Sequence, residues 1–434
     1  MPDKETYYTP FEGYSTPHIS LGLPFDQAIL KHARDTYAAK RIYLIVSNSI
    51  SKTDNFAKLR AALGANLVGI RYGIKQHVPW TDVLEIAKEL HSARADLLVT
   101  LGAGSLTDGA KVAALAAANG AFDEDALSRL HAGAEPAQES VEANRVPIVC
   151  IPTSLSGGEY TPFGGATDFR THRKCSFQHP SIGPDLVILD PELCTTTPVR
   201  VWLASGMRSV DHCVEGLTSS FFSPKSRTPA DQRREAEEAF LEGLRLLLQG
   251  LLTTKRDHAD VEARKQSQLG AVAAMRGLKV GVAMGASHAI GHQLGPLGVG
   301  HGETSCVMLP SVLRWNAHGA QQEESWVKER QDLVRDAFWG DESVAGAMRT
   351  RGLDKEMSSL GDVVEAYVRE LGLPGSLREV GVGRDRFEKL ADNSMEDAWI
   401  RTNPVPIESP DVVAAILNMA SGEKPHISAG HNAP

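Results

Sequence analysis

Residues 96–119, DLLVTLGAGSLTDGAKVAALAAAN, join an apolar run to an alanine-rich segment through a glycine turn. Residues 96–101 have the length and composition of a buried strand, and residues 106–119 those of a helix. Gly102 and Gly104 let the backbone approach a ligand closely, and the N–H groups at a helix N-terminus favour a phosphate. Ser105 and Asp108 also fit a capping box, so the turn alone leaves a structural and a nucleotide-binding interpretation open.

The same alternation extends on both sides of this stretch. Before it, we expect strands at 18–22, 41–47 and 67–72 and helices at 26–39, 54–63 and 81–94, with Gly64 as a C-cap and Thr81 as an N-cap. After it, residues 120–146 read as an exposed helical excursion, and strands are expected at 147–151 and 186–190. Short strands alternating with helices predict a parallel α/β sheet covered on both faces.

A second segment rich in hydroxyls and glycines, PTSLSGGEYT at 152–161, follows the strand at 147–151. Such a segment at a strand end suits phosphate or ribose contacts, and an ordinary Ser/Gly turn is the alternative. Thr153 and Ser154 begin it, and Lys174 follows in a short polar stretch.

From residue 197 onward helical patterns replace the strands. We therefore predict an N-terminal α/β domain over residues 1–194 and an all-α domain over 195–434. Long helices are expected at 202–219, 229–252, 260–275, 325–338, 361–371 and 411–420.

Three of the fifteen histidines fall within residues 285–310, GASHAIGHQLGPLGVGHGETSCVMLP. His288 and His292 are four residues apart, so on a helix they project from one face. The Gly295-Pro296 break and the glycines after it allow the chain to bring His301 near them. Such a cluster suits a metal site or a proton-transfer site, whereas a single buried histidine is usually structural.

Composition bounds the class of protein. The chain has 434 residues with 42% hydrophobic and 23% charged residues and a net charge of −9, which fits a globular protein and argues against a nucleic-acid surface. The five cysteines include no CxxC pair, which favours a reducing, cytoplasmic setting. We find no apolar run of membrane-spanning length and no secretory leader, so neither a membrane location nor secretion is expected.

Five segments together resemble the iron-containing alcohol dehydrogenase superfamily, which has the dehydroquinate-synthase-like fold: GAGSLTDGAK (102–111), PTSLSGGEYTP (152–162), DPEL (190–193), GMRSVDHCVEGL (206–217) and the histidine segment. The resemblance implies an α/β domain that binds NAD(P), a helical catalytic domain and an active site in the cleft between them. The coenzyme contacts that it implies are Asn48, Gly102, Gly104, Ser105, Asp108, Thr153, Ser154 and Lys174.

The metal-dependent members hold a divalent ion with an Asp, a His four residues later and two further histidines. By position, His212, His288 and His301 match the histidine ligands, and His292 matches a further active-site histidine. The Asp position is occupied by Arg208. A guanidinium offers no lone pair. Two unit charges 4 Å apart at an effective dielectric of ~20 interact by about 4 kcal/mol, so a dication would be repelled where a carboxylate would attract it. We therefore expect no metal, although Asp211 could replace the missing carboxylate, and Arg208 could instead turn outward to pair with Asp211.

The maleylacetate reductases are a branch described as lacking the Asp ligand, and three local features resemble them: the shortened 152–159 segment, the GMRSVDHCVEGL helix and SGGEYTPFGG. We expect an NAD(P)H-dependent reductase that transfers hydride to a small carboxylated enoate or keto substrate. His292 or His301 would donate the proton, Arg208 would bind a carboxylate or enolate, and His212 and His288 would orient the others. The alternatives are an Fe²⁺- or Zn²⁺-dependent alcohol dehydrogenase and a catalytically silent nucleotide-binding protein.

The residues that follow one predicted strand bear on the choice between NADH and NADPH. The strand at 41–47 is followed by Asn48 and Ser49, with no acid to repel a 2′-phosphate and with Lys52 nearby, so we expect NADPH to be either tolerated or preferred. The superfamily resemblance also implies a homodimer, and the only other partner expected is the small-molecule substrate.

Overall fold

The computed structural model describes residues 4–75, 77–135, 139–171, 173–320 and 325–422. These residues form two compact bodies, which we describe separately. The first body comprises residues 1–216 and 228–282, and the second comprises residues 217–227 and 283–434. The predicted domain boundary at 194/195 stays a prediction.

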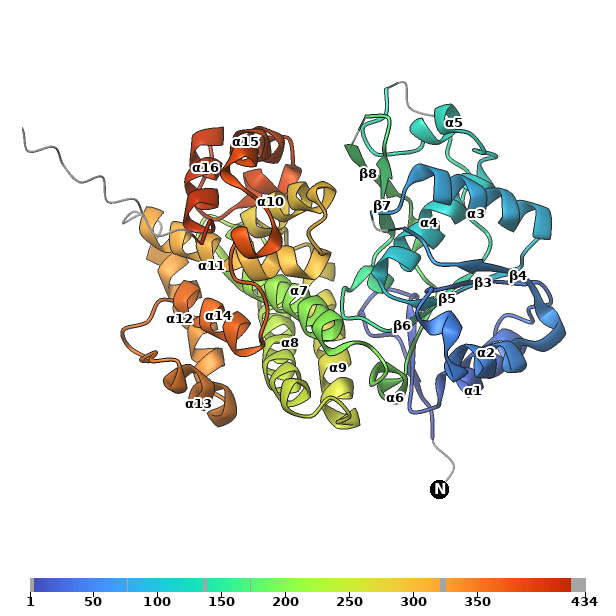
Figure 1. The fold of residues 1–434 in the computed structure, drawn as a ribbon, viewed down its shortest axis with the longest axis horizontal. Helices are drawn as coiled ribbons and strands as arrows, with labels where there is room; N and C mark the ends of the chain where they lie inside the picture. Colours follow the sequence, from blue (N-terminus) through green and yellow to red (C-terminus); the bar gives the residue numbers. More distant parts are fainter. Residues whose placement is uncertain (1–3, 76, 136–138, 172, 321–324, 423–434) are drawn as a thin grey trace, which may run out of the picture. The chain divides into compact units, whose positions relative to one another are not determined.

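A seven-stranded sheet with the order β1-β2-β9-β6-β5-β3-β4 forms the centre of the first body (Figure 1). All neighbouring strands are parallel except β1 and β2, which are antiparallel. The strands are β1 (Thr6–Tyr8), β2 (His18–Leu21), β3 (Ile42–Val46), β4 (Leu67–Tyr72), β5 (Leu97–Gly102), β6 (Ile148–Pro152) and β9 (Leu186–Leu189).

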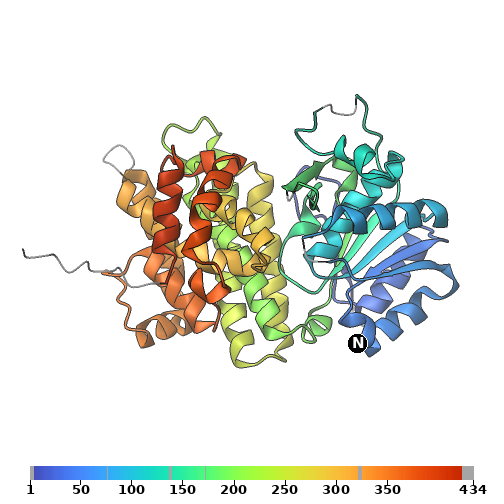
Figure 2. The same ribbon diagram turned by 45° about the horizontal axis from the view of Figure 1, so that its top comes forward.

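Side-chain alternation along the strands explains why helices cover both faces of this sheet. In β3, Ile42, Leu44 and Val46 pack with α1 and α2, whereas Tyr43 and Ile45 pack with α3 and α4. Figures 1 and 2 show these two helix layers on either side of the strands. The four helices are α1 (Phe25–Asp35), α2 (Asp54–Leu63), α3 (Trp80–Ala93) and α4 (Gly104–Ala118).

Gly64 is the C-cap of α2 as predicted, but Pro79, not Thr81, is the N-cap of α3. The expected helical excursion at 120–146 contains only the short helix α5 (Glu124–Ser128) among its described residues, and residues 136–138 lie outside the description. A two-stranded antiparallel sheet of β7 (Phe163–Asp168) and β8 (Arg173–Gln178) was not predicted from the sequence.

After β9 the described residues contain helices and no further strand. The first body continues with α6 (Pro191–Cys194), most of α7 (Val199–Thr218), α8 (Ala230–Arg256) and α9 (Val261–Lys279). The second body contains α10 (Ala286–Leu294), α11 (His301–Gly319), α12 (Ser325–Trp339), α13 (Glu342–Thr350), α14 (Leu360–Glu370), α15 (Phe387–Met395) and α16 (Pro410–Met419). The predicted fold class, α/β followed by helices, is confirmed.

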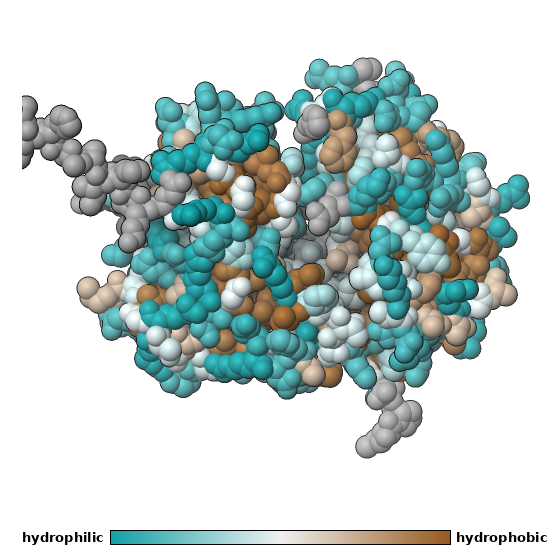
Figure 3. All heavy atoms as spheres, viewed as in Figure 1, coloured by the Kyte–Doolittle hydropathy of each residue, from teal (hydrophilic) through white to brown (hydrophobic). Residues whose placement is uncertain are grey.

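The surface is mainly hydrophilic on the face drawn in Figure 3, with separate hydrophobic patches. Within the described residues, none of the helices combines the length and the apolar character needed to cross a membrane.

Candidate functional site

Three segments predicted to contact a coenzyme lie at one edge of the first body's sheet. Asn48 follows β3, Gly102 ends β5 and Thr153 follows β6, and these three strands are parallel neighbours. The backbone N–H of Thr153 donates to the carbonyl of Gly102 at 3.0 Å, and that of Ser47 donates to Leu101 at 3.0 Å. The structure therefore brings the three segments together at the carboxyl ends of the strands, the edge at which open α/β sheets bind ligands.

The glycine turn leaves the start of α4 open. Ala103 is the N-cap of α4, and within the described chain its side chain makes no capping hydrogen bond, so the capping-box interpretation of Ser105 and Asp108 is wrong. Gly102 has a φ of +153°, and a Cβ there would come within 2.5 Å of Leu106 Cδ1. The turn thus needs glycine at 102. It presents the first N–H groups of a 15-residue helix, as a coenzyme pyrophosphate requires.

Lys174 and Asp108 lie on opposite sides of the β7–β8 hairpin. The Lys174 side chain crosses Gly165, where an added Cβ would lie 2.4 Å from its Cε. On the other side, Gly164 packs against Asp108, whose backbone oxygen would lie 3.0 Å from a Cβ at that glycine. The hairpin therefore packs on α4 through Gly164, and the Lys174 side chain lies on its other face.

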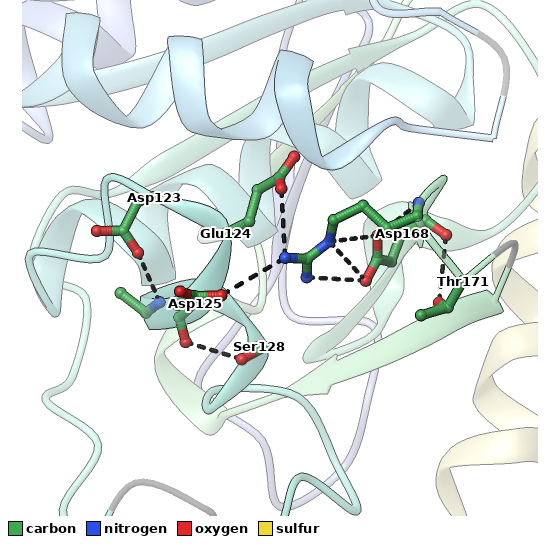
Figure 4. Close-up of polar contacts among 8 residues, drawn as sticks. Asp123, Glu124, Asp125, Ser128, Asp168 and Thr171 are labelled. Carbon is green, nitrogen blue, oxygen red and sulfur yellow. Dashed lines mark hydrogen bonds and ion pairs between the residues drawn. The ribbon is translucent and has the colours of Figure 1, made fainter.

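An ionic clasp fixes the turn of this hairpin (Figure 4). The Arg170 guanidinium donates to Asp168 at 2.9 Å and lies 3.3 Å from Glu124 and 3.5 Å from Asp125. The hydrogen bond from Arg170 lowers the pKa of the Asp168 carboxyl. The clasp ties the hairpin to α5 and so holds the backbone that carries Lys174.

A buried lysine couples α4 to the Ser/Gly segment behind the turn. Lys111 Nζ donates to the carbonyl of Phe163 at 2.9 Å, to Thr161 Oγ1 at 3.2 Å and to the carbonyl of Gly158. One turn earlier on α4, Thr107 Oγ1 donates to the buried Glu159 carboxyl at 3.0 Å. Burial lowers the pKa of Lys111 and raises that of Glu159. These contacts hold the two predicted coenzyme segments in one arrangement.

Arg208 and His212 are both buried on α7, in the first body. Arg208 is 2% exposed, and its Nη1 lies 4.0 Å from Asp211 Oδ2. The ion pair with Asp211 that the alternative interpretation expected is therefore present, and both side chains are buried rather than turned toward solvent. The role of Arg208 in the active site stays a prediction. Burial and the Arg208 cation lower the pKa of His212 to about 3, so its imidazole is neutral near pH 7.

His212 also lies beside the Ser/Gly segment. A Cβ at Gly157 would lie 3.8 Å from His212 Cε1. In addition, Ser205 Oγ on α7 accepts a hydrogen bond from the Leu155 N–H of the same segment at 3.1 Å. The face of α7 that carries Arg208 and His212 thus packs near Thr153 and Ser154.

In the second body, His288, His292 and His301 lie close together, as the sequence predicted. The His292 and His301 rings are stacked with centroids 6.5 Å apart, and the Trp399 ring contacts both His288 at 5.5 Å and His292 at 5.2 Å. His288 is fully buried, and His301 is exposed as the first residue of α11.

Sequence reasoning missed two residues of this cluster. His292 Nδ1 lies 2.8 Å from Asp397 Oδ2, and both side chains are partly exposed. Asp397 and Trp399 come from a segment 105 residues or more from His292 in the chain, and no local pattern marks them. A carboxylate on Nδ1 fixes the orientation of the imidazole ring.

A parallel sheet with an open glycine turn, followed by helices that carry a histidine cluster, defines a nucleotide-binding α/β protein with a helical part suited to acid–base chemistry. The model of the iron-containing alcohol dehydrogenases matches residues 25–191, and the model of the C-terminal part of that family matches residues 203–420. The chain belongs to the iron-containing alcohol dehydrogenase family and is an NAD(P)-dependent oxidoreductase.

Its relatives include two fungal dehydrogenases and a maleylacetate reductase. Dehydrogenase FUM7 of Gibberella moniliformis is 39% identical over 94% of this chain and 96% of its own length. Dehydrogenase ALT3 of Alternaria alternata is 41% identical over 88% of this chain and 99% of its own length. The crystal structure of maleylacetate reductase from Rhizobium sp. strain MTP-10005 superposes with a TM-score of 0.69, at 24% identity over 97% of this chain and 98% of that one. The last similarity supports the fold alone.

Proposed function

We propose that the chain is an NADPH-preferring reductase that transfers hydride to a small carboxylated enoate or keto substrate without a metal. The observation that carries this proposal is the buried Arg208 on α7, at the position where the resemblance places a carboxylate ligand. A guanidinium cannot ligate a cation, but its five N–H donors suit a carboxylate or an enolate oxygen. Arg208 would thus stabilise the negative charge that builds up during reduction.

His292 is the proton donor in this proposal. Its contact with Asp397 orients the ring and stabilises the imidazolium form, as a general acid requires. His301, whose ring stacks on His292, is the second candidate. His212 does not suit this role, because its lowered pKa leaves it without a proton to give near pH 7. His212 and His288 would orient the other groups.

The coenzyme would lie along the edge formed by Asn48, the 102–105 turn, Asp108, Thr153, Ser154 and Lys174. The open N-terminus of α4 fits its pyrophosphate, and a bound coenzyme would supply the hydride. The preference for NADPH rests on the absence of an acidic residue directly after β3. At least a tenfold higher kcat/KM with NADH would contradict it.

The test combines elemental analysis of the purified protein with NADPH-oxidation assays on maleylacetate and small aldehydes, with and without EDTA. We expect elemental analysis to find far less than one metal ion per chain. We also expect the protein to turn over a carboxylated substrate at a rate that EDTA does not change. A stoichiometric metal whose removal abolishes turnover would contradict the metal-free mechanism. Coenzyme binding without turnover on any substrate of the panel would favour a silent nucleotide-binding protein.

A metal-dependent alcohol dehydrogenase is the second candidate, and one observation favours it. Asp211 and Glu215 are buried one turn apart on α7, with carboxylate oxygens within 4.8 Å of each other. Carboxylate oxygens are ligands for Fe²⁺ or Zn²⁺. The carboxylates of Asp211 and Glu215 could therefore replace the missing Asp, and His212 would be a further ligand from the first body. In this case the second body would contribute His288 and His301, and EDTA would abolish alcohol oxidation.

We also propose that the protein is cytoplasmic, as its cysteine usage indicates, and that it is a homodimer, as the family resemblance implies. The substrate would be its only other partner. Light scattering on the eluate of a sizing column checks the oligomeric state. A monomer at micromolar concentration would contradict the dimer.

A further inference from the structure

The segment between β4 and α3 contains two adjacent residues in a backbone conformation that side chains disfavour. His77 has a φ of +64° and Val78 a φ of +52°. For a β-branched valine the left-handed region is a genuine outlier, and such residues persist where the surrounding structure holds them. Glycine, which avoids this cost, occupies neither position.

Hydrogen bonds from the β7–β8 hairpin hold this backbone in place. The Thr167 N–H donates to the Val78 carbonyl at 2.8 Å, and Thr167 Oγ1 donates to the His77 carbonyl at 2.7 Å. The Val78 side chain is buried in the core between the sheet, α3 and α4. The conformation of His77 is therefore determined by its neighbours and not by its own preference.

The same segment borders the proposed coenzyme edge at both ends. At its start, the Gly73 N–H donates to the carbonyl of Val46 at 2.7 Å, and a Cβ on Gly73 would lie 2.4 Å from Asn48 Nδ2. Further along, Val78 Cγ1 would lie 3.4 Å from a Cβ on Gly109, in the second turn of α4. His77 thus lies between Asn48 and the hairpin that carries Lys174.

The imidazole of His77 has an unsatisfied ring nitrogen within the described part of the chain. Its Nε2 is buried and has no hydrogen-bond partner among the residues that the structure describes. Burial and the nearby Lys174 ammonium lower the pKa of His77, so the ring is neutral near pH 7. A buried, unsatisfied ring nitrogen is unfavourable unless a ligand or water completes it.

We propose that His77 contacts the coenzyme, with Nε2 bonded to a ribose hydroxyl. A hydroxyl both donates and accepts, so it can pair with either tautomer of a neutral imidazole, whereas a phosphate accepts only and suits the Lys174 ammonium and the α4 N–H groups better. This inference rests on the proposed coenzyme site and adds a residue to it. It also explains why the disfavoured backbone at His77 is maintained.

The test measures the NADPH dissociation constant by fluorescence for the wild-type protein and three variants. His77→Gly removes the imidazole and relieves the backbone, so we expect an unchanged or higher melting temperature together with a roughly 5- to 10-fold weaker affinity. His77→Asn tolerates the left-handed backbone but has a shorter side chain, and it should lose affinity as well. His91→Ala, an exposed histidine of α3 in the same body, is the matched control and should bind as the wild type does.

A His77→Gly protein that is folded and binds NADPH as tightly as the wild type would overturn the inference and leave the proposed function standing. If that variant fails to fold, the same comparison is made with His77→Asn. A wild-type protein that binds neither NADPH nor NADH would overturn the proposed function and this inference together. Loss of affinity in His91→Ala to the same extent would also overturn it, because the effect would then be nonspecific.

Discussion

Arg208 shows how one residue changes the chemistry open to a site. It is buried with Asp211, and its cation is one of the two causes that keep His212 neutral. The sequence was sufficient to identify Arg208 as a departure from the family pattern, because the departure concerns residue type alone. Its burial was not predictable, because outward and inward rotamers fit the same i,i+3 pairing.

Replacing Arg208 by lysine separates charge from shape. Arg208→Lys keeps a cation opposite Asp211, so the melting temperature should change little, but it removes the planar pair of donors that suits a carboxylate. We expect kcat/KM for a carboxylated substrate to fall by roughly 10- to 100-fold, or about 1.4–2.7 kcal/mol of transition-state stabilisation. Steady-state kinetics and thermal unfolding check this. Unchanged kinetics would place Arg208 outside the substrate site.

Asp397 is the second residue whose role can be isolated. Asp397→Asn keeps the size of the side chain but removes the charge that supports a protonated His292. We expect kcat to fall by roughly 100-fold or more with little change in the NADPH dissociation constant. Asp392→Asn, an exposed acid of α15 in the same body, is a suitable control. A variant with full kcat would show that His292 does not need the carboxylate.

Among the elements, the strands of the parallel sheet were the most predictable. Their apolar runs reflect burial on both faces, and β4 was predicted with the bounds that the structure gives. The β7–β8 hairpin was missed because its strands, FGGATD and RKCSFQ, are rich in glycine or polar residues and show no clear alternation. Its pairing is decided by packing on α4, which no local pattern records.

The short strand β1 was missed as well, and a buried carboxylate anchors it to α1. Glu5, whose side chain is 7% exposed, contacts His32 Nε2 at 2.6 Å and Lys31, and it accepts a hydrogen bond from Ser20 Oγ at 2.6 Å. Burial alone would raise the pKa of Glu5, but its hydrogen bonds to Lys31, Ser20 and His32 outweigh burial and lower the pKa to about 2.

This lowered pKa predicts acid sensitivity. A carboxyl with a pKa of about 2 in the folded chain and 4.5 in the unfolded chain stabilises the fold fully above pH 4.5, and this contribution is lost as the pH falls from 4.5 toward 2. The loss amounts to at most about 3 kcal/mol. Urea unfolding between pH 5 and pH 2.5 should therefore show a smaller pH dependence for Glu5→Gln than for the wild type. Equal slopes would contradict the assignment, and Glu12→Gln, an exposed acid nearby, is the control.

At the scale of the whole molecule, the order of elements was enough to predict an α/β part followed by helices, and the motifs were enough to identify the family. The partnership of His292 with Asp397 and Trp399 was not predictable, because it joins segments far apart in the chain. The same holds for Lys111, whose three acceptors lie about fifty residues further on.

Coenzyme binding should stabilise some regions and not others. With NADPH at 100 times its dissociation constant, the protein gains about 2.7 kcal/mol against unfolding. We expect slower hydrogen exchange at residues 101–108 and 153–161, and unchanged exchange in α13. Mass spectrometry of peptic peptides checks this prediction. Protection confined to other regions would argue that the coenzyme lies elsewhere.

The first body is not continuous in the chain. It needs residues 1–216 and again residues 228–282, so α8 and α9 complete it only after the start of the second body has been made. A ribosome adds ~5–20 residues per second, so synthesis of α8 and α9 is complete on the order of several seconds after the last strand of the parallel sheet has been made. During that interval the buried faces of α7 would be open to chaperones, and synonymous codons that slow translation between residues 217 and 282 would lengthen this exposure.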